Sequence, residues 1–187
     1  KIKKIKLGLP FEKETEMGPL ISEVQVMRVK SLIESAKEEG AKLLCGGELA
    51  KESKLKNGFF FMPSLLINCH EKMTIIKEEI FGPVITVEKF TSTKEALRLA
   101  NQTKDRLSAG FWTEDKEKQK KLANELDFGT IWVNDYNIYF PEAPWGGIKH
   151  SGLGRELGRL GYEEYTEIKH IYLNSSPKKL NYFAKDE

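Results

Sequence analysis

The sequence predicts an α/β domain with an open, mostly parallel sheet and crossover helices. Segments with apolar residues at helical spacing alternate with short segments rich in β-branched residues, and Gly or Pro separates most of them. A helix between two strands is the usual crossover connection of a parallel sheet. With 187 residues, the chain is long enough to bury one sizeable core.

The clearest predicted helix lies in the first quarter of the chain. Ser22 is a good N-cap residue, and Gly40 is a natural helix stop. We expect a strand over residues 3–9 before this helix and another over residues 41–45 after it. The predicted inward face of the helix consists of Val26, Val29, Leu32, Ile33 and Ala36.

The middle of the chain contains two further predicted strands around a short helix. Residues 59–67 read as a strand pair that is interrupted at Pro63, and a proline indicates an edge strand. Residues 72–80 read as a short helix. Residues 84–90 are rich in β-branched and aromatic side chains, which predicts a buried strand.

The second half repeats the alternation. Thr93 and Asp115 are predicted to cap two helices, and strands are expected over residues 109–113 and 130–134.

The predicted domain comprises residues 1–160, and residues 161–187 form a C-terminal arm. Residues 158–161 contain two glycines and are interpreted as a hinge. The strand expected over residues 168–173 has no evident mate, and an unpaired strand tends to join another chain. Pairing within the chain is the alternative.

Composition limits the classes of partner. The formal net charge of +2 argues against a nucleic-acid partner, and the alternating basic residues 1–6 fit a half-buried strand better than a nucleic-acid arm. No apolar run approaches the roughly 18 residues that span a bilayer, so no membrane partner is expected. Two cysteines without metal-site spacing favour a reducing, cytoplasmic location and no zinc. The sequence starts without Met in a predicted strand, so we expect a piece of a longer protein.

The stretch from Glu78 to Val84, with the sequence E-E-I-F-G-P-V, looks like a ligand-binding turn. Pro83 after a glycine forces a sharp turn before the next strand. Carboxylates at such a turn can accept hydrogen bonds from ligand hydroxyl groups, and the ring of Phe81 can lie against a flat ring. The alternative is that the acids are solvated and Phe81 belongs to the core.

This stretch resembles a motif of the NAD(P)-dependent aldehyde dehydrogenases, and further matches follow in family order over about residues 5–174. The segment from Trp132 to Gly147 is most similar to betaine aldehyde dehydrogenases. The resemblance implies part of a catalytic domain and an arm that joins a homodimer or homotetramer. The other matching segments are residues 17–19, 39–47, 129–134, 143–147 with Lys149, and 151–158.

The resemblance assigns cofactor contacts to the 78–84 stretch. Glu79 would bind the nicotinamide ribose hydroxyls of NAD or NADP, because a carboxylate is a charged bidentate acceptor. Phe81 would flank the nicotinamide. Glu78 is interpreted as structural or solvated.

Trp145 is the candidate substrate-binding residue. It lies between Pro144 and two glycines, and the resemblance places it in the aldehyde-entry channel. An indole face attracts a cation by roughly 0.5–2 kcal/mol, which suits betaine aldehyde or a similar aminoaldehyde. Tyr136, Tyr139 and Phe140 could extend this aromatic wall, although ordinary packing is the simpler expectation for each.

Three more residues receive roles from the resemblance. Glu156 is the catalytic candidate, in a charge relay with an upstream lysine; a structural ion pair with Arg155 or Arg159 is the alternative. The backbone carbonyl groups of Lys149 and Gly152 match ligands of a monovalent cation such as potassium in some betaine aldehyde dehydrogenases.

Neither cysteine is interpreted as the nucleophile. Aldehyde oxidation in this family needs a thiolate and a general base, but Cys45 matches a family segment that is not catalytic. The nucleophile, the base Glu and the nucleotide-binding domain are expected upstream, since no Gly-x-Gly-x-x-Gly follows a strand here. We therefore expect this chain alone to be inactive.

Two departures from the family pattern concern local geometry. Asp105-Arg106-Leu107-Ser108 stands where the family usually has Tyr-Gly-Leu and a small residue, and Arg106 cannot adopt a positive φ as easily as Gly. Pro141-Glu142 replaces a commoner polar pair. A non-catalytic assembly module, or a dehydrogenase for a semialdehyde or aliphatic aldehyde, are the alternative functions.

Overall fold

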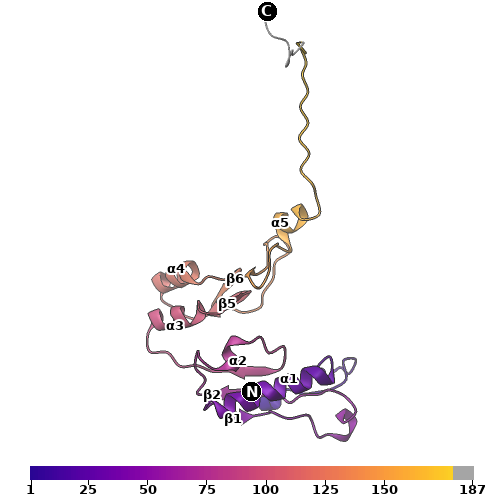
Figure 1. Ribbon diagram of the computed structural model, residues 1–187, viewed down its shortest axis with the longest axis vertical. Helices are drawn as coiled ribbons and strands as arrows, with labels where there is room; N and C mark the ends of the chain where they lie inside the picture. The colour runs from indigo at the N-terminus through magenta and orange to yellow at the C-terminus, as the bar shows by residue number, and fades with distance from the viewer. Residues whose placement is uncertain (179–187) are drawn as a thin grey trace, which may run out of the picture.

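The computed structural model describes residues 1–178, in which helices and strands alternate along the chain (Figure 1). The α/β class predicted from the sequence is thereby confirmed. In chain order, the elements are the 3-10 helix η1 (Ile2–Lys4), α1 (Glu23–Glu38), β1 (Lys42–Cys45), the 3-10 helix η2 (Ser53–Leu55), β2 (Ser64–Ile67), α2 (Thr74–Lys77), β3 (Val84–Thr86), α3 (Thr93–Ala100), β4 (Asp105–Arg106), β5 (Ser108–Phe111), α4 (Lys116–Glu125), β6 (Thr130–Val133), β7 (Ile148–Lys149) and α5 (Gly158–Glu163).

The strands of the described residues form three small sheets. In the first, β2 lies between β1, to which it is antiparallel, and β3, to which it is parallel. In the second, β5 is parallel to β6; in the third, β4 is antiparallel to β7. Helix α2 joins the parallel pair β2 and β3, and α4 joins β5 and β6, as crossover connections require.

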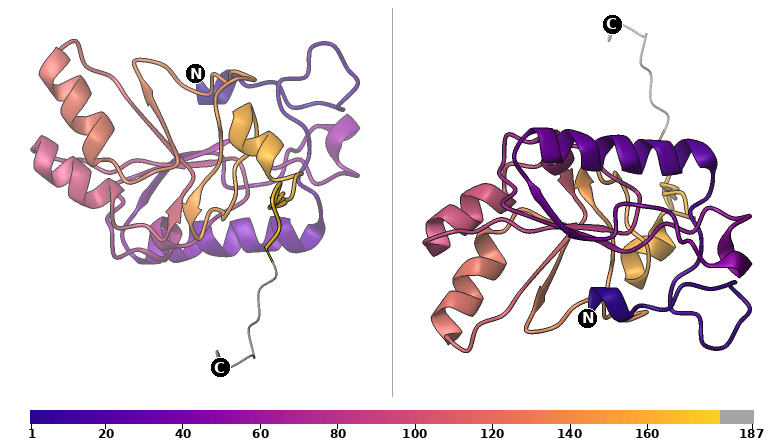
Figure 2. Two further views of the ribbon diagram at one scale, coloured as in Figure 1. Left: turned by 90° about the horizontal axis from the view of Figure 1, so that it is seen from above. Right: turned by 90° about the horizontal axis from the view of Figure 1, so that it is seen from below.

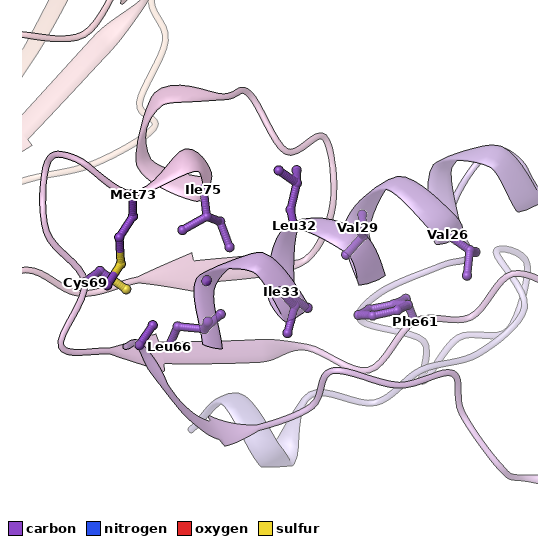
Figure 3. Packing of buried hydrophobic residues seen from close by; sticks show 11 residues of the cluster. Val26, Val29, Leu32, Ile33, Phe61, Leu66, Cys69, Met73 and Ile75 are labelled. Carbon is purple, nitrogen blue, oxygen red and sulfur yellow. The ribbon is translucent and has the colours of Figure 1, made fainter. Parts of the chain in front are cut away.

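The main hydrophobic core lies between α1 and the first sheet, and α1 runs along one face of this sheet (Figure 2). All five residues predicted for the inward face of α1 are buried. They pack against Phe61, Leu66, Met73 and Ile75 (Figure 3). The hydroxyl oxygen of Ser22 accepts a hydrogen bond from the backbone N–H of Gln25 at 3.3 Å, which confirms the predicted N-cap.

The start of the chain differs from the prediction. Residues 3–9 do not form a strand: η1 is followed by a single bridge between Leu7 and Met17. The backbone of Lys6 and Gly8 bonds to that of Glu16 and Met17, and the lysine side chains of residues 1–6 stay exposed. The alternation of lysine with apolar residues was therefore a misleading signal.

The prediction for the middle of the chain was wrong in two places. Pro63 does not mark an edge: it comes just before β2, the central strand, so its missing N–H falls outside the ladder. Strand β3 ends at Thr86 and is not fully buried, because in the described structure it has a neighbouring strand on one side only. The side chain of Ile85 is 52% exposed.

Helix ends were predicted with mixed success. Asp115 caps α4 as expected, accepting hydrogen bonds from two backbone N–H groups. The cap of α3 is Ser92 rather than Thr93, because the Ser92 hydroxyl accepts the N–H of Glu95 at 3.2 Å. Residues 158–161 are not a hinge but the first turn of α5.

The C-terminal segment leaves the body of the molecule after α5 (Figure 1). Residues 168–173 make no strand pairing within residues 1–178, and Ile168, Ile171, Tyr172 and Leu173 are exposed. The final part of the predicted arm, residues 179–187, lies outside the described residues. In residues 1–178 no helix combines the length and apolar character that crossing a bilayer demands.

Candidate functional site

The turn after α2 is fastened to α1 through its backbone. The side-chain amide of Gln25 donates hydrogen bonds to the carbonyl oxygens of Ile80 and Phe81, at 2.7 and 2.9 Å. The guanidinium of Arg28 donates to the carbonyl oxygen of Glu79 at 2.9 Å. These three hydrogen bonds use only main-chain acceptors of the turn, so none of them occupies the carboxylate of Glu79 or the ring of Phe81.

Gly82 allows the turn to approach α1 closely. A Cβ atom at this position would lie 2.5 Å from Cγ2 of the buried Val29. On the other side of the turn, the carbonyl oxygen of Pro83 accepts the N–H of Ser64 at 2.8 Å, at the start of β2. Contacts with α1 on one side and with β2 on the other therefore fix the backbone of the turn.

The two glutamates of the turn have different surroundings. Helix α2 ends at Lys77, earlier than predicted, so both glutamates follow it. The carboxylate of Glu78 meets the guanidinium of Arg28 at 3.5 Å. The carboxylate of Glu79 is exposed and has no ion pair or hydrogen bond within residues 1–178. Glu79 is therefore the carboxylate that is available to a ligand.

Phe81 is presented to the surroundings rather than packed in the core. Its φ angle is +49°, an unusual value for a bulky residue, and its side chain is 71% exposed. The alternative of a buried Phe81 is thus wrong. An exposed aromatic ring two residues after a free carboxylate is the pairing that the sequence predicted.

A cavity of about 240 Å³ lies beside the turn. Glu78 and Glu79 line it from one side. Leu107 and Ser108, at the start of β5, and Phe128, just before β6, line it from the other. The turn therefore faces the other half of the molecule.

Trp145 lies in an aromatic cluster, the set Trp132, Tyr136, Tyr139 and Trp145. Its ring meets that of Tyr139 edge-to-face, with centroids 5.5 Å apart. Tyr139 and Tyr136 make the same kind of contact with Trp132, at 5.8 and 5.4 Å. Phe140 is exposed and makes no such ring contact in the described structure. Of the three residues expected to extend the aromatic wall, Tyr136 and Tyr139 belong to the cluster that contains Trp145, and Phe140 does not.

The backbone of Trp145 is paired with that of Glu156. Each donates its N–H to the other's carbonyl oxygen at 2.7 Å. The indole Nε1 of Trp145 is buried and finds no acceptor among residues 1–178. This pairing fixes the position of the indole while leaving its one polar atom unused.

A second cavity, of about 340 Å³, is lined by Trp145, Gly147, Glu156 and Leu107 among others. Leu107 thus lines both this cavity and the one beside Glu79. The cavity beside the predicted cofactor-binding turn and the cavity beside the predicted substrate-binding Trp145 are therefore neighbours that share Leu107.

The side chain of Glu156 is exposed, and the ion-pair alternative for it is wrong. Arg155 donates instead to the carbonyl oxygens of Gly147 and Gly154, at 2.9 and 2.8 Å. Arg159 pairs with Glu163 at 2.6 Å.

The predicted cation ligands Lys149 and Gly152 lie on the loop that follows Trp145. Both have positive φ, +54° and +151°. The ammonium group of Lys149 pairs with the carboxylate of Asp127, so the candidate ligand atom of this residue is its backbone carbonyl oxygen. In residues 1–178, no three His, Cys, Asp or Glu residues are grouped to hold a metal. The predicted ligand atoms are the backbone carbonyl oxygens of Lys149 and Gly152, a donor type that fits a hard monovalent cation.

The two cysteines are free thiols that do not resemble a nucleophile. Cys69 is buried, and burial raises its pKa, which disfavours the reactive thiolate. Cys45 lies at the end of β1 with its Sγ 3.9 Å from the carbonyl oxygen of Pro63. The prediction that neither is catalytic agrees with these surroundings.

Sequence reasoning missed several residues that build the site. Gln25 and Arg28 received no role from the sequence, although both hold the turn from α1. Leu107 was noted only as part of a departure from the family pattern. The spacing of Gln25 and Arg28, three residues apart on one helix side, was the available signal.

Comparison with known proteins identifies the family of this chain. The aldehyde dehydrogenase family pattern matches residues 1–171. Betaine aldehyde dehydrogenase of Bacillus subtilis is 50% identical over 181 residues, which are 97% of this chain and 37% of that protein. The mouse 4-trimethylaminobutyraldehyde dehydrogenase is 45% identical over 90% of this chain and 34% of its own length.

Solved structures show the same likeness. The crystal structure of a betaine aldehyde dehydrogenase from Staphylococcus aureus in complex with NAD+ superposes with a TM-score of 0.91 at 46% identity. The superposition covers 98% of this chain and 37% of that one. The chain thus spans little more than a third of the length of these relatives. With the family pattern matched over nearly all of its length, this chain belongs to the aldehyde dehydrogenase family.

Proposed function

We propose that this chain forms the C-terminal part of the catalytic region of an NAD(P)-dependent dehydrogenase that oxidises a cationic aldehyde to a carboxylate. Betaine aldehyde or a similar aminoaldehyde is the proposed substrate. The similar bacterial, mouse and staphylococcal enzymes are named for betaine aldehyde or 4-trimethylaminobutyraldehyde, and the staphylococcal enzyme binds NAD+. Both named aldehydes carry a quaternary nitrogen.

One observation supports the cofactor site most strongly. The carboxylate of Glu79 is unpaired within the described structure, although the backbone carrying it is fixed by Arg28 at 2.9 Å. A fixed, charged acceptor can hold two neighbouring ribose hydroxyl groups by short hydrogen bonds. The exposed ring of Phe81 then supplies a flat apolar surface for the nicotinamide. When bound, the nicotinamide supplies the acceptor for hydride.

The aromatic cluster supports a cationic substrate. Its two tryptophans and two tyrosines hold one another edge-to-face, with centroids 5.4–5.8 Å apart. Such an arrangement leaves ring faces available to a quaternary ammonium group, for which the attraction is about 0.5–2 kcal/mol per ring.

The bond-making groups are proposed to lie on the rest of the protein. Oxidation through a thiohemiacetal and a thioester needs a thiolate and a base for hydrolysis. Cys69 is buried with a raised pKa, and Cys45, at the end of β1, lines neither the cavity beside Glu79 nor the one beside Trp145. We therefore expect no dehydrogenase turnover from residues 1–187 alone. The exposed carboxylate of Glu156 remains the candidate for a proton relay.

Three further proposals concern the surroundings of the enzyme. The carbonyl groups of Lys149 and Gly152 would hold a monovalent cation, which would stiffen the loop after Trp145. The exposed apolar residues of 168–173 would pair with a second copy in a homodimer or homotetramer. The free thiols fit a reducing compartment such as the cytoplasm.

A substrate panel on the full-length enzyme tests the proposed function. Wild type should prefer cationic over neutral aldehydes, and Trp145→Ala should lower the ratio of their kcat/KM values roughly tenfold, as loss of a cation–π contact implies. Trp112→Ala is the matched control, because Trp112 is exposed outside the aromatic cluster. An unchanged preference in Trp145→Ala would refute the role of the indole. A preference for neutral semialdehydes in wild type would assign the enzyme to another substrate class.

A further inference from the structure

Arg106 is a buried charged residue outside the sites described so far. It is 4% exposed and lies in β4, with an ordinary φ, where the family resemblance led us to expect a glycine turn. The expected conflict with a positive φ therefore does not arise. A buried guanidinium is costly unless nearly all of its donors are satisfied.

The guanidinium of Arg106 contacts two segments of the chain. It donates to the carbonyl oxygen of Thr103 at 2.9 Å and to the side-chain oxygen of Asn101 at 3.2 Å, just after α3. It also donates to the carbonyl oxygen of Asn101. On the other side it reaches the carboxylate of Asp127 at 3.8 Å and lies 5.5 Å from the ring centre of Phe128. Arg106 thus ties the end of α3 to the turn between α4 and β6.

The same residue is attached to the loop that carries Trp145. Its backbone N–H donates to the Ser151 hydroxyl at 2.8 Å, and its strand position pairs with Ile148 in β7. Asp127, which Arg106 meets, also binds the ammonium of Lys149. The pKa of Asp127 is lowered by the hydrogen bond from Lys149 and by the charges of Lys149 and Arg106, so the carboxylate stays ionised at neutral pH. The loop 145–151 is therefore fastened at three points.

Two residues, Leu107 and Gly129, connect Arg106 to the two cavities and to the 145–151 loop. Leu107 follows Arg106 directly and lines both cavities. On the turn after α4, Gly129 packs against the loop so closely that a Cβ there would overlap the carbonyl oxygen of Gly146. Gly129 in turn donates its N–H to the carbonyl oxygen of Arg106 at 3.2 Å. A movement of Arg106 would thus be transmitted to the residue beside Trp145.

We propose that Arg106 is a positioning residue for the aldehyde: by tying α3 and the 127–129 turn to β4, it holds the 145–151 loop and the indole of Trp145 in place. The inference rests on the proposed function, because Trp145 acts on substrate only if the enzyme oxidises an aldehyde. Misplacement of a binding group by about 1 Å can lower catalytic efficiency a hundredfold, so the effect should be measurable.

The test compares three variants of the full-length enzyme. Arg106→Met removes the charge but keeps an apolar stem, whereas Arg106→Lys keeps a charge that can still pair with Asp127. Arg98→Met is the control, because Arg98 also makes an ion pair, with Glu71 at 2.6 Å, but has no contact with the loop. We would measure kcat and KM for betaine aldehyde and for NAD+, together with hydrogen exchange of the amides in residues 145–151.

We expect Arg106→Met to raise the aldehyde KM about tenfold, since displacement of a positioned binding group has effects of this order. The KM for NAD+ should change much less, and loop amides should exchange faster. Arg106→Lys should recover part of the KM, and Arg98→Met should behave as wild type. An unchanged aldehyde KM and unchanged loop exchange in Arg106→Met, even with a lower Tm, would overturn the inference and leave Arg106 purely structural.

A second variant covers the case in which Arg106→Met does not fold. Ser151→Ala removes only the hydroxyl that accepts the Arg106 N–H. It should raise the aldehyde KM by a smaller factor and speed exchange of the loop, and no change in either would also overturn the inference. Failure of the proposed function is separate: wild-type enzyme would then oxidise no aldehyde with NAD+ or NADP+.

Discussion

At the scale of single residues, the site depends on how two adjacent carboxylates diverge. Glu78 follows α2 with extended backbone angles, φ −100° and ψ 137°. Successive side chains on extended backbone point to opposite sides. The carboxylate of Glu78 therefore pairs with Arg28 on α1, and the carboxylate of Glu79 stays available to a ligand. The family resemblance assigned the cofactor role to Glu79 and a structural or solvated role to Glu78, but the ion pair of Glu78 with Arg28 could not be predicted from the sequence.

Glu88 offers a pH test that is independent of catalysis. Burial, and secondly repulsion from Glu71, raise the pKa of this carboxyl above its ordinary 4.5, although His70 and Arg98 oppose the shift. The folded state therefore binds the proton more tightly than the unfolded state. Stability from this group is present at low pH and is lost as the pH rises from 4.5 through the raised pKa.

The expected result for Glu88→Gln follows from that sign. The variant should have a higher Tm than wild type at pH 7, and the difference should shrink as the pH falls towards 4.5, the ordinary value. Thermal unfolding of both proteins across this range measures it. Glu117→Gln, at an exposed position of α4, serves as the control. A Tm difference between Glu88→Gln and wild type that grows as the pH falls would contradict a raised pKa for Glu88.

At the scale of elements, the sequence predicted the long helix α1 well, but it predicted short elements and the order of strands poorly. The 16-residue helix α1 was found from its cap, its apolar face and its stop, because these signals agree over several turns. Helix α2 has only 4 residues, so nothing in the pattern showed that its backbone would become extended at Glu78. The Pro63 and β3 errors share one cause: which strand is central depends on pairing between distant segments.

Helix α1 also contributes to the site by holding the 78–83 turn. Gln25→Ala would remove two hydrogen bonds, to Ile80 and Phe81, of 2.7 and 2.9 Å. We expect NAD+ binding by the full-length enzyme to weaken about threefold to tenfold, since each such bond contributes roughly 0.5–1.5 kcal/mol to keeping the turn in place. Calorimetric titration with NAD+ measures the change.

The control for this prediction is Gln119→Ala. Gln119, on α4, also donates to a loop carbonyl, that of Thr113 at 2.8 Å, but it lies outside both subsites. Both variants should lose a similar amount of stability, and only Gln25→Ala should lose affinity. Equal NAD+ affinities in the two variants would show that α1 does not hold the turn for the cofactor.

At the scale of the whole molecule, the described part of the chain exposes apolar side chains on its C-terminal segment. Ile168, Ile171 and Tyr172 stand on an extended segment with no strand partner in residues 1–178 (Figure 1). The sequence analysis expected an arm here because the strand has no evident mate and because the family resemblance implies one. Which surface, if any, this segment pairs with could not be predicted, because strand pairing between distant segments or chains leaves no signal in the local sequence.

The double variant Ile168→Asp and Ile171→Asp tests the arm. In a homo-oligomer of the full-length enzyme, charges on the apolar side of a pairing strand should weaken association, so light scattering should show a smaller particle at low micromolar concentration. Lys169→Asp, which introduces the same residue between them, should have a weaker effect. An unchanged mass of the double variant would show that this arm does not join subunits.

The most direct test of the whole account is NAD+ binding to the full-length enzyme with either glutamate of the turn changed. Glu79→Gln should weaken binding at least tenfold, since hydrogen bonds to a charged group contribute about 1.5–3 kcal/mol. Glu78→Gln, which removes only the 3.5 Å ion pair with Arg28, should stay within about threefold of wild type because exposed pairs contribute little. Equal affinities for Glu79→Gln and wild type would contradict the account.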